Sequence, residues 1–389
     1  MKRVFLTILC KVLKKTARAT PRDLRSARFL IPGYTGLGNF ILKTPMIRSL
    51  RQCFPKVEIY LLAGNDFGAE FVLQDSGLLT ETFILKETRS MISKLRFCLR
   101  LRRRKIDVLF LPFDTSPPFL WLGGLLAGIP IRAANVWPDF FHTPDWIHEV
   151  PTHTCETKKN RHEIDLNYDL LETVIGPIER SYNTTFSIAD WRSTLLRFGL
   201  EAQGYVVVQV SVSNAGITAR RWPKAHFAQL IKMLSDLGFK IVLVGDKNEA
   251  DYASDFAELS GTTPMNLVGK TAVSEVAEII RGSALLVCHD SGLMHIGNAL
   301  GTPLVALFGP SDLTKVRPLA STSRVVRLDL PCVPCMANFA KTEEEAVRDC
   351  PINIQCMRDL SVEDVYRACR EVLAAQRGIT DEAPRKTRS

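Results

Sequence analysis

The sequence alternates short apolar runs with longer amphipathic stretches, and this alternation occurs twice along the chain. Such a rhythm is typical of parallel sheets built from strand–helix–strand units. In the first half, helices are expected over 41–54 and 161–176. The expected strands of this half are RFLIPG (28–33), VEIYLLAG (57–64), IDVLFLPF (106–113) and IRAANV (131–136).

The second half restarts the pattern at Gly204. Its expected strands are 205–211, 240–245, 265–269, 284–290 and 302–309, and its expected helices are 222–238, 249–261, 273–283, 292–301 and 362–376. With 389 residues the chain is too long for one compact core and fits two domains. We therefore predict an α/β protein in which two Rossmann-like domains face each other across a cleft.

The predicted domain boundaries follow this repeat. They are a basic N-terminal extension (1–27), an N-terminal Rossmann-like domain (28–181), a weakly patterned linker (182–203), a C-terminal Rossmann-like domain (204–352), and a C-terminal helix and tail (353–389). Open parallel sheets bind ligands outside the carboxyl ends of their strands, so loops from both domains are expected to point into the cleft.

The formal net charge of +9 is concentrated in residues 1–28 and 96–105. A basic surface attracts nucleic acid, an acidic membrane or a phosphorylated substrate. Aromatic residues do not interleave with the basic runs and no nucleic-acid motif occurs, so nucleic acid is not expected as a partner. An anionic membrane surface or a phosphorylated substrate is expected instead. A solvated helix face is the alternative for the cluster near Arg103.

The N-terminal MKRVFLTILCKVLKK has a short apolar run that Lys11 interrupts, and it lacks a small-residue cleavage site. An amphipathic basic helix on an anionic membrane is expected here, and a frayed extension is the alternative. The sequence has no apolar span of about 20 residues, so no transmembrane helix is expected. Together these features predict a cytoplasmic protein, peripheral on the inner face of the membrane.

Polar residues at strand ends of the second half predict a binding site. Asp290 ends a strand, Ser291 and Gly292 form the turn, and His295 lies one turn into the next helix. The free N–H groups of such a turn, together with the helix dipole, form an anion site. A structural N-cap is the alternative interpretation of Asp-Ser-Gly at this place.

Two further strand ends carry groups that suit a nucleotide. Ser211, Ser213 and Arg220 or Arg221 can hold phosphate oxygens, although a flexible surface loop has the same composition. Glu249 can accept bonds from ribose hydroxyls, and an acid at a helix N-terminus is its alternative role.

In the first half, the loop GYTGLGN (33–39) lies between a strand and a helix. Gly36 and Gly38 let the backbone approach a ligand, although their spacing does not match the dinucleotide fingerprint. Asn39 is a candidate site residue, with capping of the next helix as its alternative role.

Together these segments resemble the heptosyltransferase family, glycosyltransferase family nine, whose members are inverting enzymes of the GT-B fold. The resemblance covers about residues 28–375 and is most specific in NLVGKTAVSEVAEIIRGSALLVCHDSGLMHIGNALGTPLVALFGPSD (266–312). GLGNFILKTPMIRSLR is similar to the family's glycine loop and following helix, and RRWP (220–223) to its basic-x-Trp-Pro signature. The resemblance implies transfer of a sugar, with heptose favoured, from ADP-heptose or another nucleoside-diphosphate sugar to a lipopolysaccharide-core or other lipid-linked glycan.

Site roles are implied by the same resemblance. Ser291 and Gly292 are expected to bind the donor diphosphate, Asp290 to hold the sugar or phosphate region, and His295 to support the pocket. Arg220 takes the place of a phosphate-binding Lys, and Glu249 that of the ribose ligand. Ser211 and Ser213 are expected by the phosphates.

The resemblance breaks at the acceptor side, where the family carries an Asp thought to deprotonate the acceptor hydroxyl. Here that position is Asn39, and an amide cannot usefully accept the proton. Either Asn39 only orients the acceptor or the base comes from elsewhere, and Asp114 at the end of the 106–113 strand is the candidate. A non-catalytic nucleotide-sugar-binding relative and a GT-B-fold sugar epimerase are the alternative functions.

The implied reaction is a single displacement that needs no metal and no cofactor. Charge on the leaving diphosphate is expected to be stabilised by Arg220, the amides at 291–292 and the helix dipole. Cys332, Cys335, Cys350 and Cys356 form a separate cluster in the spacing C-x2-C-x14-C-x5-C. A structural metal site, a redox-labile pair and buried thiols all remain open for it.

Overall fold

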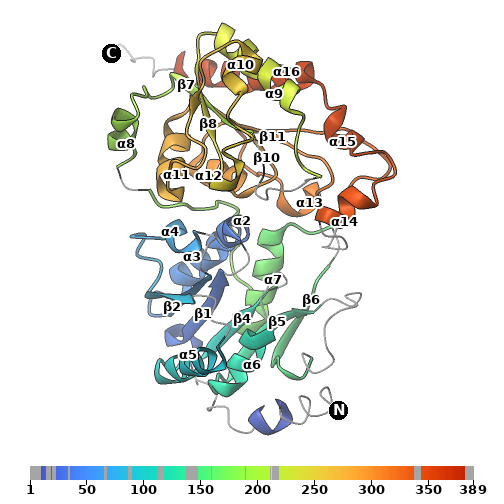
Figure 1. Ribbon diagram of the computed structural model, residues 1–389. Coiled ribbons are helices and arrows are strands. Elements are labelled where there is room, and N and C mark those ends of the chain that lie inside the picture. The colour runs from blue at the N-terminus through green and yellow to red at the C-terminus, as the bar shows by residue number, and fades with distance from the viewer. Residues whose placement is uncertain are drawn as a thin grey trace, which may run out of the picture. The chain divides into compact units, whose positions relative to one another are not determined.

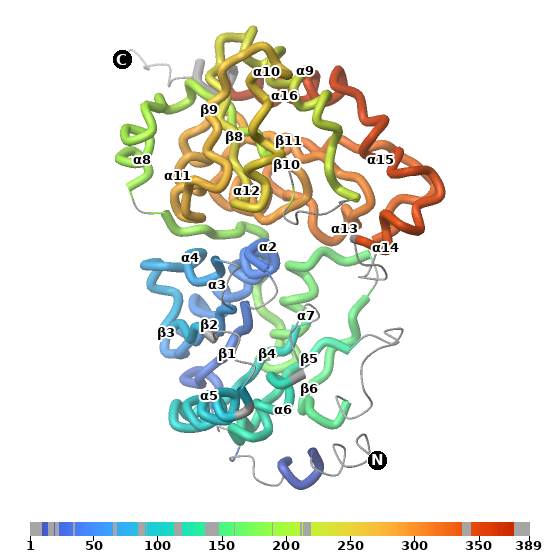
Figure 2. Tube along the Cα trace, in the orientation of Figure 1, coloured from blue at the N-terminus to red at the C-terminus, as the bar shows by residue number. Residues whose placement is uncertain are grey.

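The computed structural model divides the chain into two compact units, Met1–Ser187 and Ile188–Ser389. It describes residues 10–14, 19, 23–33, 36–64, 68–85, 90–112, 118–136, 148–158, 160–188, 190–210, 212, 219–336 and 343–381. Figure 1 labels their helices and strands, and Figure 2 traces the same chain as a tube.

Unit 1 contains a parallel sheet of six strands in the order β3-β2-β1-β4-β5-β6. Its strands are β1 (Arg28–Gly33), β2 (Glu58–Gly64), β3 (Glu81–Leu85), β4 (Val108–Leu111), β5 (Ile131–Val136) and β6 (His153–Glu156). The strand order reverses between β1 and β4, and ligands of open α/β sheets bind at such a point, beyond the carboxyl ends of the strands.

Helices cover both faces of this sheet. They are α2 (Leu37–Ile41), α3 (Thr44–Cys53), α4 (Ala69–Val72), α5 (Met91–Arg103), α6 (Pro118–Leu126) and α7 (Glu163–Ile175), after a short 3-10 turn η1 (Leu24–Ser26). Phe97 of α5 and Trp121 of α6 share a buried cluster with Leu30 and Leu109 of the sheet. Because side chains alternate along a strand, Phe29 and Ile31 point to the other face, where α3 packs against α7.

Unit 2 repeats this plan with a parallel sheet in the order β12-β11-β10-β7-β8-β9. Its strands are β7 (Tyr205–Gln209), β8 (Lys240–Val244), β9 (Met265–Asn266), β10 (Leu285–His289), β11 (Leu304–Leu307) and β12 (Ser323–Val326). Its helical elements are α8 (Trp191–Arg197), α9 (Lys224–Asp236), η3 (Lys247–Glu249), α10 (Phe256–Ser260), α11 (Val273–Gly282), α12 (Gly292–Leu300), α13 (Leu313–Val316), α14 (Glu343–Arg348), α15 (Gln355–Arg358) and α16 (Val362–Asp381). The predicted α/β class with two Rossmann-like sheets is confirmed.

The C-terminal helix α16 is part of the core of unit 2. Val365, Cys369 and Val372 are buried in the same cluster as Val287 of β10 and Val305 of β11. Figure 1 shows α16 beside α9, and the two helices are in contact.

Several element predictions differ from the structure. The units divide at 187/188, inside the predicted linker, and that linker contains α8, which packs against α11. The helix expected over 249–261 is shorter and forms only as α10. At its expected start, Asp246 and Glu249 form a capping box that closes the 3-10 turn η3. The prediction missed β3, β6 and β12. These are edge strands, and the half-exposed β6 and β12 lack a continuous apolar run.

The predicted N-terminal extension is described at residues 10–14, which are helical, and in parts of 19–27. Cys10 is fully buried in the cluster that also holds Phe97 and Trp121. The Lys14 ammonium donates a hydrogen bond to the Glu149 carboxylate at 3.0 Å. Residues 10–14 are therefore packed on unit 1 and do not fray there. Across the described ranges, no helix is both long and apolar enough to cross a membrane.

Candidate active site

The strand–turn–helix predicted around Asp290 is present at the junction of β10 and α12. Ser291 is the N-cap of α12, but its side chain makes no capping hydrogen bond. Its hydroxyl instead donates to the Gln209 side-chain oxygen at 2.7 Å, at the end of the adjacent strand β7. Among the described residues, the Ser291 side chain therefore does not occupy the amides at the start of α12, and an anion site needs such amides.

Arg220 lies at the same strand end. Its Nη1 donates to the Asp290 carbonyl oxygen at 2.8 Å and stands 4.0 Å from the Asp290 carboxylate. The Arg220 side chain is 25% exposed, so the guanidinium can still reach a ligand. The structure thus brings together two residues, 70 positions apart in sequence, that the prediction assigned to one site.

A neutral histidine holds the segment that carries Arg220. The Trp222 backbone N–H donates to His289 Nε2 at 3.1 Å, and the Trp222 indole N–H donates to the Leu360 carbonyl at 2.9 Å. Burial, together with the nearby charges of Arg220 and Arg221, lowers the pKa of His289 to about 3. The ring is therefore uncharged at neutral pH and can accept the Trp222 bond. The sequence analysis missed His289, because a histidine in an apolar strand resembles an ordinary core residue.

Glu249 occupies its predicted place after β8, but its carboxylate also has a structural task. Oε2 accepts the Asp246 backbone N–H at 2.8 Å and completes the capping box of η3. The side chain is only 3% exposed. A Cβ at Gly245 would lie 2.6 Å from that same oxygen, so any larger residue there would displace the Glu249 carboxylate. Glu249 therefore fills its alternative role at a helix N-terminus, and its binding of ribose stays a prediction.

The remaining predicted donor residues are placed as follows. Gly292 is the first residue of α12, and His295 is its fourth and is buried. Ser211 and Ser213 lie outside the described residues. They follow Gln209, the last residue of β7.

On unit 1, the glycine loop leads into α2. Gly36 is the N-cap with φ of 145°, a backbone conformation that favours glycine, and Gly38 is buried inside the helix. Asn39 is the third residue of α2, so its predicted alternative role as a helix cap is wrong. Asp114 lies outside the described residues and follows β4, the neighbour of β1 in the sheet.

Asn39 contacts a buried carboxylate that the sequence analysis missed. Its Nδ2 donates to Glu163 Oε2 at 3.3 Å, and its backbone carbonyl accepts from the Lys43 ammonium at 3.5 Å. Glu163 is 2% exposed and is the first residue of α7. His162 caps this helix, with Nδ1 accepting from the Ile164 N–H at 3.3 Å.

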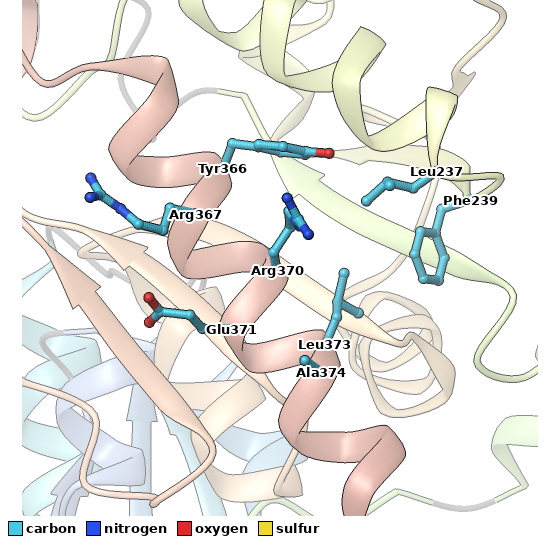
Figure 3. A pocket seen from close by; sticks show the side chains of 8 residues that line it. All are labelled: Leu237, Phe239, Tyr366, Arg367, Arg370, Glu371, Leu373 and Ala374. Carbon is cyan, nitrogen blue, oxygen red and sulfur yellow. The ribbon is translucent and has the colours of Figure 1, made fainter.

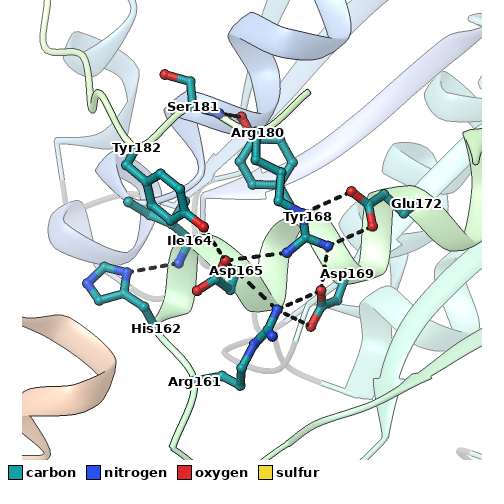
Figure 4. Close-up of polar contacts among 10 residues, drawn as sticks. All are labelled: Arg161, His162, Ile164, Asp165, Tyr168, Asp169, Glu172, Arg180, Ser181 and Tyr182. Carbon is teal, nitrogen blue, oxygen red and sulfur yellow. Dashed lines mark hydrogen bonds and ion pairs between the residues drawn. The ribbon is translucent and has the colours of Figure 1, made fainter. Parts of the chain in front are cut away.

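A charged network fixes α7 against the following segment (Figure 4). Arg180 donates to Asp169 at 2.7 Å and to Glu172 at 2.6 Å, and Arg161 also donates to Asp169. The hydrogen bonds that Arg180 donates to Glu172 contribute most to raising the pKa of Arg180. The network ties down the helix whose first residue is Glu163, so it helps to fix that carboxylate beside Asn39.

A surface cavity of about 560 Å³ lies away from these strand ends (Figure 3). It is lined by Leu237 and Phe239, which directly precede β8, and by residues of α16 such as Tyr366 and Arg370. It is therefore at the amino end of β8, whereas Arg220 and Asp290 lie at the carboxyl end of the sheet.

The four clustered cysteines are close enough to influence one another. Burial, with smaller contributions from Cys335, Cys350 and Cys332, raises the pKa of Cys356 to about 11. No disulfide links cysteines in the described ranges, and no group of three or more His, Cys, Asp or Glu side chains there is placed to hold a metal ion. Of the three alternatives for this cluster, a buried thiol fits Cys356. The other three cysteines are partly exposed.

The chain matches a known protein family. The family model for glycosyltransferase family 9 (heptosyltransferase) matches residues 151–345, which include Arg220, Glu249 and the whole 288–312 stretch. The chain belongs to glycosyltransferase family 9. The resemblance noted in the sequence is thereby confirmed.

An individual member of family 9 is similar to this chain over a shorter stretch. Lipopolysaccharide heptosyltransferase 2 of Escherichia coli (strain K12) is 38% identical over 114 residues, which is 28% of this chain and 33% of that protein. The chain thus spans about a third of the length of that relative.

Solved structures of family 9 share the fold. A family 9 glycosyltransferase from Veillonella parvula has a TM-score of 0.74 at 21% identity, covering 92% of this chain and all of that one. The E. coli ADP-heptose lipopolysaccharide heptosyltransferase II has a TM-score of 0.69 at 22% identity, covering 90% and 99%. The fold of this family 9 member is therefore GT-B.

Proposed function

We propose that the protein is an inverting glycosyltransferase that moves heptose from ADP-heptose to a lipopolysaccharide-core acceptor. The observation that carries this proposal is the convergence of Arg220 and Asp290 beside the start of α12, which its N-cap side chain leaves uncapped, inside the stretch that matches family 9. A positive side chain and a helix N-terminus at one strand end suit a nucleoside diphosphate. The similarity to heptosyltransferase 2 supports heptose as the sugar.

The donor is held by unit 2. The diphosphate binds the amides of Ser291 and Gly292 and the Arg220 guanidinium, and we assign Ser211 and Ser213, which follow β7 in the sequence, to the same phosphates. Asp290 and His295 hold the sugar side of the pocket, and Glu249 holds the ribose. The Ser291 hydroxyl donates to Gln209 and does not cap the amides of the first turn of α12.

The acceptor is held by unit 1. Asn39 Nδ2 is taken by Glu163, so Oδ1 is the atom left to accept a bond from the acceptor hydroxyl. Asp114 follows the neighbouring strand β4 and takes the proton. Glu163 is a positioning residue in this scheme, since its burial keeps it behind Asn39.

The reaction is a single displacement. The acceptor oxygen forms a bond to the anomeric carbon while the bond from that carbon to the diphosphate breaks, and the hydroxyl proton passes to Asp114. Arg220 and the α12 amides stabilise the charge that develops on the leaving diphosphate, which makes the transfer independent of a metal. The protein works in the cytoplasm, on the inner face of the membrane.

A non-catalytic nucleotide-sugar-binding protein is the second candidate, and the amide of Asn39 in place of a carboxylate favours it. Thermal shift with ADP-, GDP- and UDP-sugars and an assay of sugar transfer separate the two functions. Stabilisation by ADP-heptose with transfer supports the proposal. Stabilisation without transfer to any acceptor supports the second candidate, and no stabilisation by any of these donors contradicts both.

A further inference from the structure

Helix α5 exposes a stripe of large aliphatic side chains on the face opposite its buried side. Phe97, Cys98 and Leu101 are buried against the core of unit 1. Ile92, Leu95 and Leu99 are 64%, 53% and 49% exposed. Their spacing of three and four residues places them in one row along the helix.

A row of this kind is different from isolated exposed apolar residues, which are common on soluble proteins. A contiguous apolar surface with a polar border marks a site of interaction. Within unit 1, α5 therefore has two apolar faces, and only one of them is covered by the sheet.

The borders of this stripe are basic. From Ser90 to Ile106 the sequence holds seven Lys or Arg residues and no acid: Lys94, Arg96, Arg100, Arg102, Arg103, Arg104 and Lys105. At 3.6 residues per turn, Arg102 falls on one side of the stripe and Arg96 and Arg103 on the other. Arg100 and Arg104 pair with Glu81 at 3.0 and 2.9 Å. Arg96, Arg102 and Arg103 are exposed, and no ion pair involves them in the described part of the chain.

A second segment adds to the same surface chemistry. Cys10 shares the buried cluster of Phe97 and Leu101, so residues 10–14 pack on the same part of unit 1 as α5. In that segment Val12 is 54% exposed, and the Lys11 side chain is 63% exposed. Exposed aliphatic and basic side chains therefore occur together at two places on unit 1, on α5 and on residues 10–14.

We propose that α5 is the surface by which the protein docks on an anionic lipid bilayer, with Ile92, Leu95 and Leu99 entering the headgroup boundary. Amphipathic helices with an apolar row and basic flanks bind membranes in this way, and each cation near an acidic leaflet adds to the affinity. A second copy of the chain fits less well, because symmetric pairing of α5 would oppose its own cations. The inference rests on the proposed function, since a lipid-linked acceptor explains why a transferase would dock there.

The test uses the full chain and vesicles of phosphatidylcholine, with or without about 30% phosphatidylglycerol. Wild-type protein is expected to co-sediment with the anionic vesicles and not with the neutral ones. Ile92→Ser, Leu95→Ser and Leu99→Ser together are expected to weaken this binding at least tenfold. Arg96→Ala, Arg102→Ala and Arg103→Ala together are expected to weaken it comparably at low salt. The matched control, Leu196→Ser with Leu259→Ser, removes aliphatics that are 80% and 50% exposed on unit 2 and should bind like wild type.

Each result has a defined meaning. No vesicle binding by wild type, or full binding by the triple serine variant, overturns the proposal. A wild-type dimer in solution that the serine variant converts to a monomer also overturns it, because α5 would then be a protein interface. The vesicles contain no glycan acceptor, and stabilisation by ADP-heptose is measured on the same samples. Failure of docking is therefore distinguishable from failure of the proposed transferase function.

Discussion

The Asn39 side-chain amide donates a hydrogen bond to the buried Glu163 carboxylate, with Nδ2 and Oε2 3.3 Å apart. This contact fixes which way the amide faces. A Cβ built on Gly36 would lie 3.2 Å from Asn39 Oδ1, so the oxygen faces the glycine loop. The amide therefore offers an acceptor atom to the loop side and keeps its donor for α7.

If Glu163 acts by holding Asn39, then Glu163→Ala should raise the KM for the acceptor and lower kcat about tenfold, because misplacing a substrate contact is costly. Glu163→Gln retains an oxygen that can accept the Asn39 bond and should recover much of the activity. The Kd for ADP-heptose should not change. If the Gln variant is as inactive as the Ala variant and the acidic limb of the pH–rate profile disappears, Glu163 is itself the base and the positioning role is wrong.

Asp114→Asn tests the base directly. Removing a general base typically lowers kcat by about 10²- to 10⁴-fold, while binding of the donor by unit 2 should be unaffected. Steady-state kinetics and calorimetry with ADP provide the two readouts. A kcat within a factor of about three of wild type would exclude Asp114 as the proton acceptor.

Arg220→Ala should weaken ADP binding about 10- to 100-fold, because a charge-assisted hydrogen bond contributes about 1.5–3 kcal/mol. The adjacent Arg221 is the matched control, since its guanidinium stacks on the Tyr252 ring at 4.7 Å. Arg221→Ala, which removes the same charge, is expected to change the Kd less than about threefold. Equal losses in the two variants would show that general positive charge, and not the position of Arg220, governs donor affinity.

His289 should make the protein acid-labile. Its folded pKa is about 3, below the ordinary histidine value of about 6.5. Between these values the unfolded chain binds the additional proton, so the free energy of unfolding falls as pH decreases, by up to about 1.4 kcal/mol per unit from this group. Urea titrations of wild type and His289→Gln at pH 7 and pH 5 check this. The variant should lose less stability on acidification, and an identical loss would contradict the assignment.

The sequence predicted the central strands well because each is a continuous apolar run, such as YVVVQ in β7, where every residue is buried. The edge strand β6, with alternating burial in HTCE, lacks that signal. Arg220 and Asp290 could be assigned to one site because both follow strands of one parallel sheet. Glu163 could not be found this way, since its contact with Asn39 spans 124 residues and depends on how α7 packs.

The roles of two buried polar residues could not be predicted from the sequence either. Gln209 and His289 lie within apolar strands, and nothing local distinguishes them from core positions. Their roles depend on partners from other elements, the Ser291 hydroxyl and the Trp222 N–H. Such contacts require the three-dimensional structure.

The most direct test of the account is mass spectrometry of heptose-deficient lipopolysaccharide incubated with purified protein and ADP-heptose. The account predicts that the acceptor gains the mass of one heptose, and that Asp114→Asn abolishes the gain while still binding ADP. An acceptor of unchanged mass, from protein that no ADP-, GDP- or UDP-sugar stabilises, would contradict the central claim.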